Sequence, residues 1–508
     1  MLEKLYTRKI LEASKRLGMY SNLTPYHLFQ LLGFEIGWLQ GESGCVDSSL
    51  EYLLTQHPDM QVLRIKKSQC TDEGLQYIFS LGKKLTHIEL SESEISGDGL
   101  RNPHEAEIRL HLKELSLKCD NGLTDSGLKK IISYIQYEML ETLDISSEAS
   151  GITETGFISL LSIIGANLRK LNMRGLEISL SEINSLTTTL SNLEDLDVSR
   201  CGNFTETGFI TLLNIVGGRL RKLRMSYLKI ELTKIHFLTT TLSNLEDLDI
   251  SRCERFTESG FISLLNIVGG RLRKLNMSSL KVSLSEINSL TTNLQNLEDL
   301  DISWCDEISE ALFISLLSIV GGRLRRLKMV MLRISLSEIS SLTSSLPNLE
   351  DLNISDCSKI PETVFISLIN IVGGHLRKLN ISGLRISLSE MNSLTTTLPN
   401  LEDLDISDCS KLTETTFISL LNIVGGHLRK LNMSCNKLCL SEVSSLTTSL
   451  GNLEDLDISY CKMIPQPSLT TLLNAAGGLK RLEMQGLDAS LLVTDSLTAN
   501  LSTLTIIS

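Results

Sequence analysis

The sequence repeats itself every 52 residues over more than half of its length. One phrase, Asn-Leu-Glu-Asp-Leu-Asp/Asn-Ile/Val-Ser-x-Cys, begins at Asn192, Asn244, Asn296, Asn348, Asn400 and Asn452. A second phrase, Leu-Arg-Lys/Arg-Leu-x-Met/Ile, begins at Leu220, Leu272, Leu324, Leu376 and Leu428. Repetition at a fixed period of this length is typical of solenoids, in which each unit buries its apolar face against the next. We therefore expect one continuous stack.

Each unit divides into sub-repeats of 27 and 25 residues, and both contain the strand pattern Leu-x-x-Leu-x-Ile/Met/Val. In the longer sub-repeat, Thr205 is placed to cap a helix that carries Phe209 and Leu212 on one face. The glycine pair that starts at Gly217 is expected to end this helix in a left-handed conformation. In the shorter sub-repeat, Ser283-Leu-Ser-Glu286 resembles a capping box and predicts a second helix.

Looser copies extend the pattern toward both ends of the chain. Further strands are expected to begin near Met60, Leu85, Leu112, Leu140, Leu168, Leu479 and Leu501, for about eighteen strands in all. The sequence therefore predicts an α/β solenoid, or horseshoe, over residues 47–508, with a parallel sheet on its concave side and helices on its convex side. Residues 1–46 do not match the repeat and are expected to form an N-terminal cap.

These sub-repeats resemble the leucine-rich-repeat (LRR) family, and those with cysteine are similar to its cysteine-containing subclass. Thr71-Asp-Glu-Gly-Leu75, Thr124-Asp-Ser-Gly-Leu128 and Thr257-Glu-Ser-Gly-Phe261 match the second half of that subclass's repeat. The subclass is common among F-box/LRR proteins, the substrate receptors of ubiquitin ligases, so the resemblance implies protein binding. Leu23-Thr-Pro-Tyr-His-Leu-Phe is faintly similar to the opening of an F-box, so a degenerate F-box is the alternative to a cap over residues 1–46.

Composition and motifs disfavour several classes of function. The formal net charge of −12 argues against a general nucleic-acid binder, which needs a basic face. No apolar run is long enough to cross a membrane, and no signal peptide is recognisable, so we expect a cytoplasmic protein that binds neither nucleic acid nor membrane. No catalytic motif, phosphate loop or metal-ligand spacing occurs, so we expect neither enzymatic activity nor a cofactor or metal.

Six cysteines recur, one in each unit, at Cys201, Cys253, Cys305, Cys357, Cys409 and Cys461. Equivalent positions in stacked units are not natural disulfide partners. We therefore interpret this cysteine column as small buried thiols, each donating to a neighbouring backbone carbonyl.

Charged pairs of opposite sign alternate along the stack. The longer sub-repeats carry Glu-Asp after the first strand leucine, as at Glu298-Asp299, and the shorter ones carry Arg-Lys or Arg-Arg, as at Arg273-Lys274. In a parallel stack these pairs lie side by side, about 5 Å apart. We predict that the two stripes neutralise each other and fix the register; a platform for a charged ligand is the alternative.

One position in each strand unit varies while the rest of the strand pattern is nearly fixed. It lies two residues after the third core apolar residue, and we call it the turn column: Arg200, Tyr227, Arg252, Ser279, Trp304, Met331, Asp356, Gly383, Asp408, Cys435 and Tyr460. Tryptophan, tyrosine and arginine dominate binding hot spots, so we predict that part of this column is a protein-binding site. The predicted site residues are Arg200, Tyr227, Arg252, Trp304 and Met331. Drift without a function is the alternative.

The predicted site is basic within an acidic protein, so an acidic or phosphorylated segment of a protein is the expected partner. Three functions fit these observations. The first is an intracellular scaffold or sensor that binds a protein on its concave face. The second is a substrate receptor of a ubiquitin ligase, which requires a Skp1-type adaptor. The third is the sensor half of an immune receptor.

Overall fold

The computed structural model describes residues 35–36, 46–65, 70–103, 109–119, 122–147, 151–186, 190–240, 242–268, 270–282, 294–334, 346–389, 394, 398–441, 443–446, 450–487 and 505–507. It divides into unit 1, Met1–Leu245, and unit 2, Glu246–Ser508. Each unit is an α/β solenoid in its own right.

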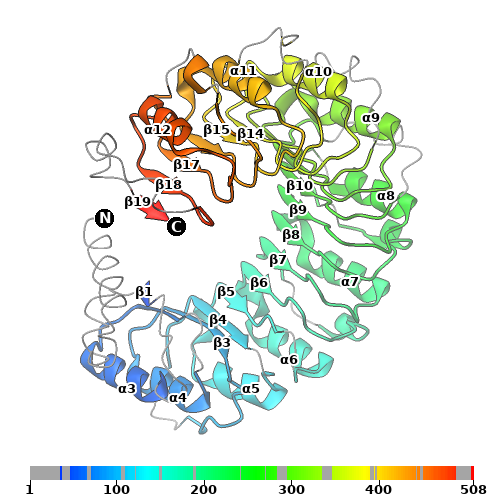
Figure 1. Ribbon diagram of the computed structural model, residues 1–508. Coiled ribbons are helices and arrows are strands. Elements are labelled where there is room, and N and C mark those ends of the chain that lie inside the picture. The colour runs from blue at the N-terminus through cyan, green and yellow to red at the C-terminus, as the bar shows by residue number, and fades with distance from the viewer. Residues whose placement is uncertain are drawn as a thin grey trace. The chain divides into compact units, whose positions relative to one another are not determined.

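Unit 1 is a parallel sheet with helices on one face (Figure 1). Its strands are β1 (Glu35–Ile36), β2 (Val62–Ile65), β3 (His87–Ser93), β4 (Glu114–Cys119), β5 (Thr142–Asp144), β6 (Lys170–Asn172), β7 (Asp195–Asp197) and β8 (Lys222–Arg224). Its helices are α3 (Val46–Gln56), α4 (Asp72–Leu81), α5 (Asp125–Ser133), α6 (Glu154–Ile164) and α7 (Glu206–Val216). Consecutive strands pair in register, so equivalent residues of neighbouring sub-repeats lie side by side.

Unit 2 follows the same plan with greater regularity (Figure 1). Its strands are β9 (Asp247–Asp249), β10 (Lys274–Asn276), β11 (Asp299–Asp301), β12 (Arg326–Lys328), β13 (Asp351–Asn353), β14 (Lys378–Asn380), β15 (Asp403–Asp405), β16 (Lys430–Asn432), β17 (Asp455–Asp457), β18 (Arg481–Glu483) and β19 (Thr505–Ile507). Its helices are α8 (Glu258–Val268), α9 (Glu310–Val320), α10 (Glu362–Val372), α11 (Glu414–Val424) and α12 (Gln466–Ala475).

The core of both units is built from the predicted leucine pattern. The middle residue of each three-residue strand from β5 to β18 is buried, as for Leu196, Leu223 and Leu300, while most of the charged residues beside it are at least partly exposed. Phe209 at the start of α7 and its equivalents fill the space between sheet and helices. None of the described helices lies on the opposite face of either sheet, which we call the open face (Figure 1). The predicted fold class is confirmed.

The helices of the longer sub-repeats begin as the sequence predicts, and they also link neighbouring sub-repeats. The hydroxyl of Thr205 accepts from the N–H of Gly208 at 3.1 Å, which caps α7. The carboxylate of Glu206 then accepts from the hydroxyl of Thr233 at 3.1 Å and from the N–H of Lys234 in the next sub-repeat. An acid in the first helical turn therefore also ties one sub-repeat to the next.

The second predicted helix is wrong for the shorter sub-repeats that the structure describes. This segment forms a single 3₁₀ turn, at Ile183–Ser185, Ile235–Phe237 and Val443–Ser445. Its serines are already engaged, because Ser179 donates to the carboxylate of Glu154 on the preceding helix. The threonines that follow, at 187–189, also have low helix propensity. The proposed capping box at 283–286 lies outside the described residues.

The predicted left-handed glycine stop is also wrong. Gly165 and Gly373 follow α6 and α10 with right-handed φ of −61° and −57°. At α7 the chain continues directly into a 3₁₀ turn, Gly217–Arg219, before the next strand. The helix therefore ends by tightening its last turn, which leaves room for a short connection.

The predicted N-terminal cap, residues 1–46, lies outside the described residues apart from Glu35–Ile36 and Val46. The two residues of β1 pair in parallel with Arg64 and Ile65 of β2. The cap and its F-box alternative both stay predictions.

Candidate protein-interaction surface

The turn column occupies one backbone conformation throughout. After each strand the chain turns at this residue, with φ of 62° at Arg200, Tyr227 and Trp304, 56° at Arg252 and 52° at Met331. The N–H of the turn residue donates to the neighbouring sub-repeat, as from Arg200 to the carbonyl of Ser226 at 2.8 Å. These φ values lie in the left-handed region that glycine adopts most readily. Sequence reasoning missed this, although Gly383 in the same column was a signal.

A second regular feature precedes the turn column. The last residue of most strands is Asp or Asn, and its side-chain oxygen accepts from the N–H two residues later, as from Ser199 to Asp197 at 2.9 Å. This local bond supports the turn and explains the recurrent Asp/Asn-x-Ser. Arg224 and Lys328 replace the Asp/Asn on β8 and β12 and cannot accept such a bond. Both lie three residues before a predicted site residue, Tyr227 or Met331.

In unit 1 the structure brings together Arg200 and Tyr227 on neighbouring turns. The guanidinium of Arg200 lies over the Tyr227 ring, 5.0 Å from its centroid, which is a cation–π contact. Arg224 extends along the open face and pairs with Asp195 at 2.9 Å. Arg200 and Tyr227 are both exposed, with 37% of Tyr227 accessible. We call Arg200, Arg224 and Tyr227 the unit 1 cluster. Its side chains form a preformed cationic and aromatic surface.

In unit 2 the structure places Arg252, Trp304 and Met331 at the ends of β9, β11 and β12. Trp304 is 48% exposed, Arg252 is exposed, and Met331 is half-buried. Lys328 on β12 is exposed and forms no ion pair with the described residues. We call Arg252, Trp304, Lys328 and Met331 the unit 2 cluster. That the five predicted residues act together as one protein-binding site stays a prediction.

Side chains of the turn column also lie over the neighbouring turn. An added Cβ on Gly383 would meet the Asp356 carboxylate, and one on Gly486 would meet the Tyr460 ring within 2.6 Å. This contact supports the alternative in which turn-column side chains merely cover the backbone beside them. The largest side chains nevertheless keep about half of their surface exposed, as 51% for Tyr460 shows.

The cysteine column is confirmed as free and buried. Where the bond is described, the thiol donates to a backbone carbonyl of the preceding sub-repeat, as from Cys201 to Met173 and from Cys305 to Met277, each at 3.1 Å. Burial raises the pKa of Cys201 and Cys305 to about 12. These thiols therefore stay protonated at neutral pH and serve the fold.

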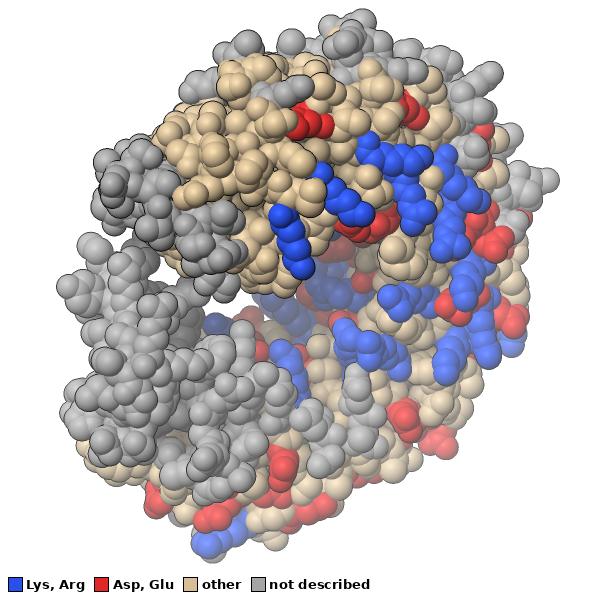
Figure 2. All heavy atoms as spheres, in the orientation of Figure 1, with Lys and Arg blue, Asp and Glu red and all other residues tan. Residues whose placement is uncertain are grey.

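The opposed charge stripes are confirmed as ion pairs between neighbouring sub-repeats. Arg325 pairs with Glu350 at 2.8 Å, and Arg326 with Asp299 at 2.9 Å. Arg377–Glu402 and Arg429–Glu454 continue this series, each at 2.5 Å. The stripes line an open groove of about 490 Å³ in unit 2, and cationic and anionic side chains are interspersed on the face shown in Figure 2. Because they pair with each other, they leave little net charge for a ligand.

Two classes of site lack a candidate among the described residues. No group of three or more His, Cys, Asp or Glu residues there is arranged to hold a metal ion. Cys435 and Cys439, the one closely spaced pair at the surface of unit 2, are exposed free thiols. None of the described helices is both long and apolar enough to span a bilayer.

Comparison with known proteins gives a consistent fold. No protein-family model matches the sequence. Among curated proteins, the chain is similar to F-box/LRR-repeat protein 4 of Bos taurus, with 25% identity over 205 residues. The match covers 39% of this chain and 32% of that protein, so the chain spans about a third of the length of this relative.

Two solved structures are similar over most of the chain. The mouse RP105/MD-1 complex matches with 18% identity and a TM-score of 0.53, over 87% of this chain and 69% of that one. The yeast Rad7 and Elc1 complex matches with 20% identity and a TM-score of 0.44, over 76% of this chain and 84% of that one. The likeness to the mouse RP105/MD-1 complex concerns the fold alone. The repeat and the likeness to the mouse complex show a leucine-rich-repeat fold, and part of the chain is similar to an F-box/LRR protein.

Proposed function

We propose that this protein binds another protein through the unit 1 and unit 2 clusters, with Arg200, Tyr227, Arg252, Trp304 and Met331 as its main contacts. The observation that carries the proposal is the presence of large, exposed side chains at left-handed turn positions. It is an intracellular scaffold or sensor in this proposal, with no catalytic role.

The left-handed backbone of the turn column indicates that its large side chains contact a ligand and are not required to form the turn. An L-residue in the left-handed region costs roughly 1–2 kcal/mol relative to its preferred conformation, and glycine avoids most of that cost. Gly383 makes the same turn with φ of 69°. The fold therefore accepts glycine here, and it does not require Trp304 or Tyr227. Bulky residues retained in strained positions are typical of functional surfaces.

The charges of the two clusters favour an acidic partner segment. In unit 1 the Arg200 guanidinium lies over the Tyr227 ring, and in unit 2 Arg252 and Lys328 are exposed cations of the same cluster as Trp304. An aromatic ring beside a guanidinium provides apolar area together with charged hydrogen-bond donors, the combination found at hot spots. A protein segment with carboxylates or phosphorylated side chains, and with an apolar residue to pack on Trp304, fits this chemistry.

The test is affinity purification with mass spectrometry on three versions of the full chain. Wild type is compared with the Arg252→Ala/Trp304→Ala double variant and with Tyr460→Ala, a turn-column residue outside the predicted site that is 51% exposed. The proposal expects a partner that wild type and Tyr460→Ala recover and the double variant loses. If a partner is recovered equally by all three folded proteins, the clusters are not its binding site.

The second candidate is a substrate receptor of a ubiquitin ligase. It is supported by the likeness to F-box/LRR-repeat protein 4, which lies in a part of that protein only. This role requires binding to a Skp1-type adaptor through residues outside the solenoid. Copurification of such an adaptor with the full chain would support it, and its absence from preparations that retain the protein partner would exclude it.

A further inference from the structure

One loop beside α7 in unit 1 departs from the repeat and belongs neither to the turn column nor to the charge stripes. Residues 231–237 read Glu-Leu-Thr-Lys-Ile-His-Phe, where residues 179–185 read Ser-Leu-Ser-Glu-Ile-Asn-Ser. The five other copies of this segment carry Glu at the position of Lys234 and Ser at the position of Phe237. These residues are Glu182, Glu286, Glu338, Glu390 and Glu442, and Ser185, Ser289, Ser341, Ser393 and Ser445.

Phe237 is the most exposed of the large apolar residues that the structure describes. It is 61% exposed, against 48% for Trp304 in the turn column. Its equivalents Ser185 and Ser445 are also exposed, so the fold needs no more than a small polar residue at this position. A single exposed apolar residue is common on protein surfaces, and three further features distinguish this one.

The first feature is a backbone that α7 holds at both ends of the loop. In the last turn of α7, the Asn214 amide donates to the Phe237 carbonyl at 3.3 Å, and its oxygen accepts from the N–H of Thr239 at 2.8 Å. In the first turn, the Glu206 carboxylate accepts from the N–H of Lys234. The ring therefore projects from a backbone that is already ordered, which lowers the entropy cost of binding.

The second feature is a compact group of side chains around the ring. The N–H of Phe237 donates to the Lys234 carbonyl at 3.0 Å and closes a 3₁₀ turn, in which residues three apart lie on the same side, about 6 Å from each other. The His236 ring lies against the phenyl ring, with 4.2 Å between the ring centroids. Glu231, which the loop also gains, precedes this turn and forms no ion pair with Lys234. We call Lys234, His236 and Phe237 the Phe237 knob.

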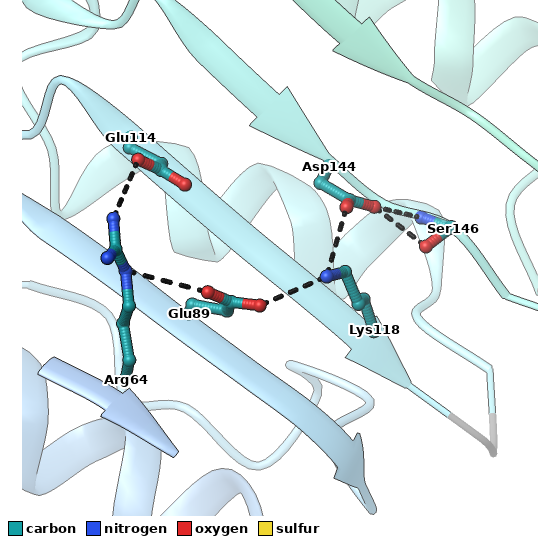
Figure 3. Close-up of polar contacts among 6 residues, drawn as sticks. All are labelled: Arg64, Glu89, Glu114, Lys118, Asp144 and Ser146. Carbon is teal, nitrogen blue, oxygen red and sulfur yellow. Dashed lines mark hydrogen bonds and ion pairs between the residues drawn. The ribbon is translucent and has the colours of Figure 1, made fainter. Parts of the chain in front are cut away.

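The third feature is a cation without a counter-ion. On the open face of unit 1, Lys118 lies 3.1 Å from Glu89 and 3.7 Å from Asp144 (Figure 3). Lys234 instead donates to the hydroxyl of Thr207 at 3.4 Å and forms no ion pair with any residue that the structure describes. Its charge, opposite to that of the Glu in the five other copies, is therefore available to an acidic group of a partner.

We propose that the Phe237 knob binds an acidic amphipathic segment of a second protein. Apolar side chains of that segment pack on the Phe237 ring, and its carboxylates pair with Lys234. An aromatic ring beside a cation supplies both apolar area and a charged hydrogen-bond donor, as at binding hot spots. The knob lies on the helical side of unit 1, whereas the turn column follows the strands, so this proposal is independent of the proposed function.

A second copy of this chain is the less favourable occupant. In a symmetric dimer the same surface contacts itself, so the two Lys234 side chains would approach each other. Like charges repel at such a contact, and the knob has no carboxylate to offset them. An acidic segment of a different protein avoids this repulsion.

The experiment selects random peptides displayed on phage for binding to the full chain. Phage that also bind a Phe237→Ser variant are first removed, because this variant restores the residue of the five other copies and leaves the turn column intact. We expect the remaining peptides to combine aromatic or aliphatic residues with Asp or Glu, and to lose binding when Lys234→Glu replaces the wild type. If Phe237→Ser does not fold, as judged by circular dichroism, Lys234→Glu is used for the removal step.

Titration of one selected peptide by fluorescence anisotropy gives the sharper result. Phe237→Ser and Lys234→Glu should each raise its dissociation constant on the order of tenfold. The control Ile163→Ser removes a 48% exposed apolar side chain from α6 and should change the dissociation constant less than about twofold. A peptide with lysine in place of its acids should bind Lys234→Glu and not the wild type.

Three results would overturn the inference: no peptide that distinguishes wild type from Phe237→Ser, selected peptides without an excess of acids, or equal weakening by Ile163→Ser. Sedimentation velocity tests the alternative occupant. A dimer that forms with the wild type and not with Phe237→Ser would make a second copy the occupant of the knob, and this result would also overturn the inference.

Discussion

The strands and the turns that follow them differ in how far the fold dictates their residues. Strand leucines such as Leu196 and Leu300 are fully buried and nearly identical from one sub-repeat to the next. The turn column shares one backbone conformation just as strictly, yet its residues range from Gly383 to Trp304. The fold therefore fixes the side chain in the strand and only the φ angle in the turn. Partner specificity can vary in the turn without disturbing the stack.

The largest expected effect is at the cysteine column, whose buried residues directly follow turn-column residues and, like the strand leucines, face the core. Cys305→Asp places a carboxylate where the thiol is buried and bonded to the Met277 carbonyl. An unpaired buried charge costs on the order of 3–5 kcal/mol, so the free energy of unfolding should fall by several kcal/mol. Urea denaturation measures this.

Cys435→Asp is the matched control, because Cys435 is an exposed residue of the turn column, where Asp356 and Asp408 already stand. It should change the free energy of unfolding by less than about 0.5 kcal/mol. Equal losses in the two variants would contradict the distinction between buried positions, which the fold fixes, and exposed turn positions, which it does not.

A smaller effect is expected from the charge stripes. In the Glu298→Lys/Asp299→Lys variant, like charges replace the pairs with Arg273 at 3.7 Å and Arg326 at 2.9 Å. These pairs are partly exposed, so the loss should be about 1 kcal/mol at low salt and smaller at high salt. Thermal melts at two ionic strengths test this. Adding Arg273→Glu and Arg326→Glu should restore the melting temperature, and failure to restore it would show that the stripes do not act as pairs.

The sequence predicts best those positions at which the fold fixes the residue type. The buried leucines and the Cys305 thiol were predictable because each repeats at a fixed spacing and burial admits few residue types. The 3₁₀ turn at Ile183–Ser185 was not predictable from the sequence. It depends on Glu154 of the preceding helix, whose carboxylate accepts a hydrogen bond from the N–H of Glu182.

The smallest expected effect separates the turn column from the residue just before it. Ser279 has φ of 55°, so Ser279→Gly relieves the left-handed backbone and should raise the free energy of unfolding by a few tenths of a kcal/mol, up to about 1 kcal/mol. Ser278→Gly, one residue earlier, relieves no such strain and should lower it by roughly 0.5–1 kcal/mol. Thermal melts should show the free energy of unfolding changing in opposite directions in the two variants. A change in the same direction would contradict the claim that the left-handed conformation strains the turn column.

The most direct measurement of the central claim is the affinity of the purified partner for Trp304→Gly, with Tyr460→Gly as the control. Both substitutions place glycine at a left-handed turn, at φ of 62° and 61°, and both remove a half-exposed aromatic ring. The fold should tolerate each, as it tolerates Gly383. If Trp304 is a contact residue, its loss should raise the dissociation constant at least about thirtyfold, the effect of a hot spot worth 2 kcal/mol, while Tyr460→Gly changes it less than about twofold. Wild-type affinity in a folded Trp304→Gly protein would contradict the claim that the turn column recognises the partner.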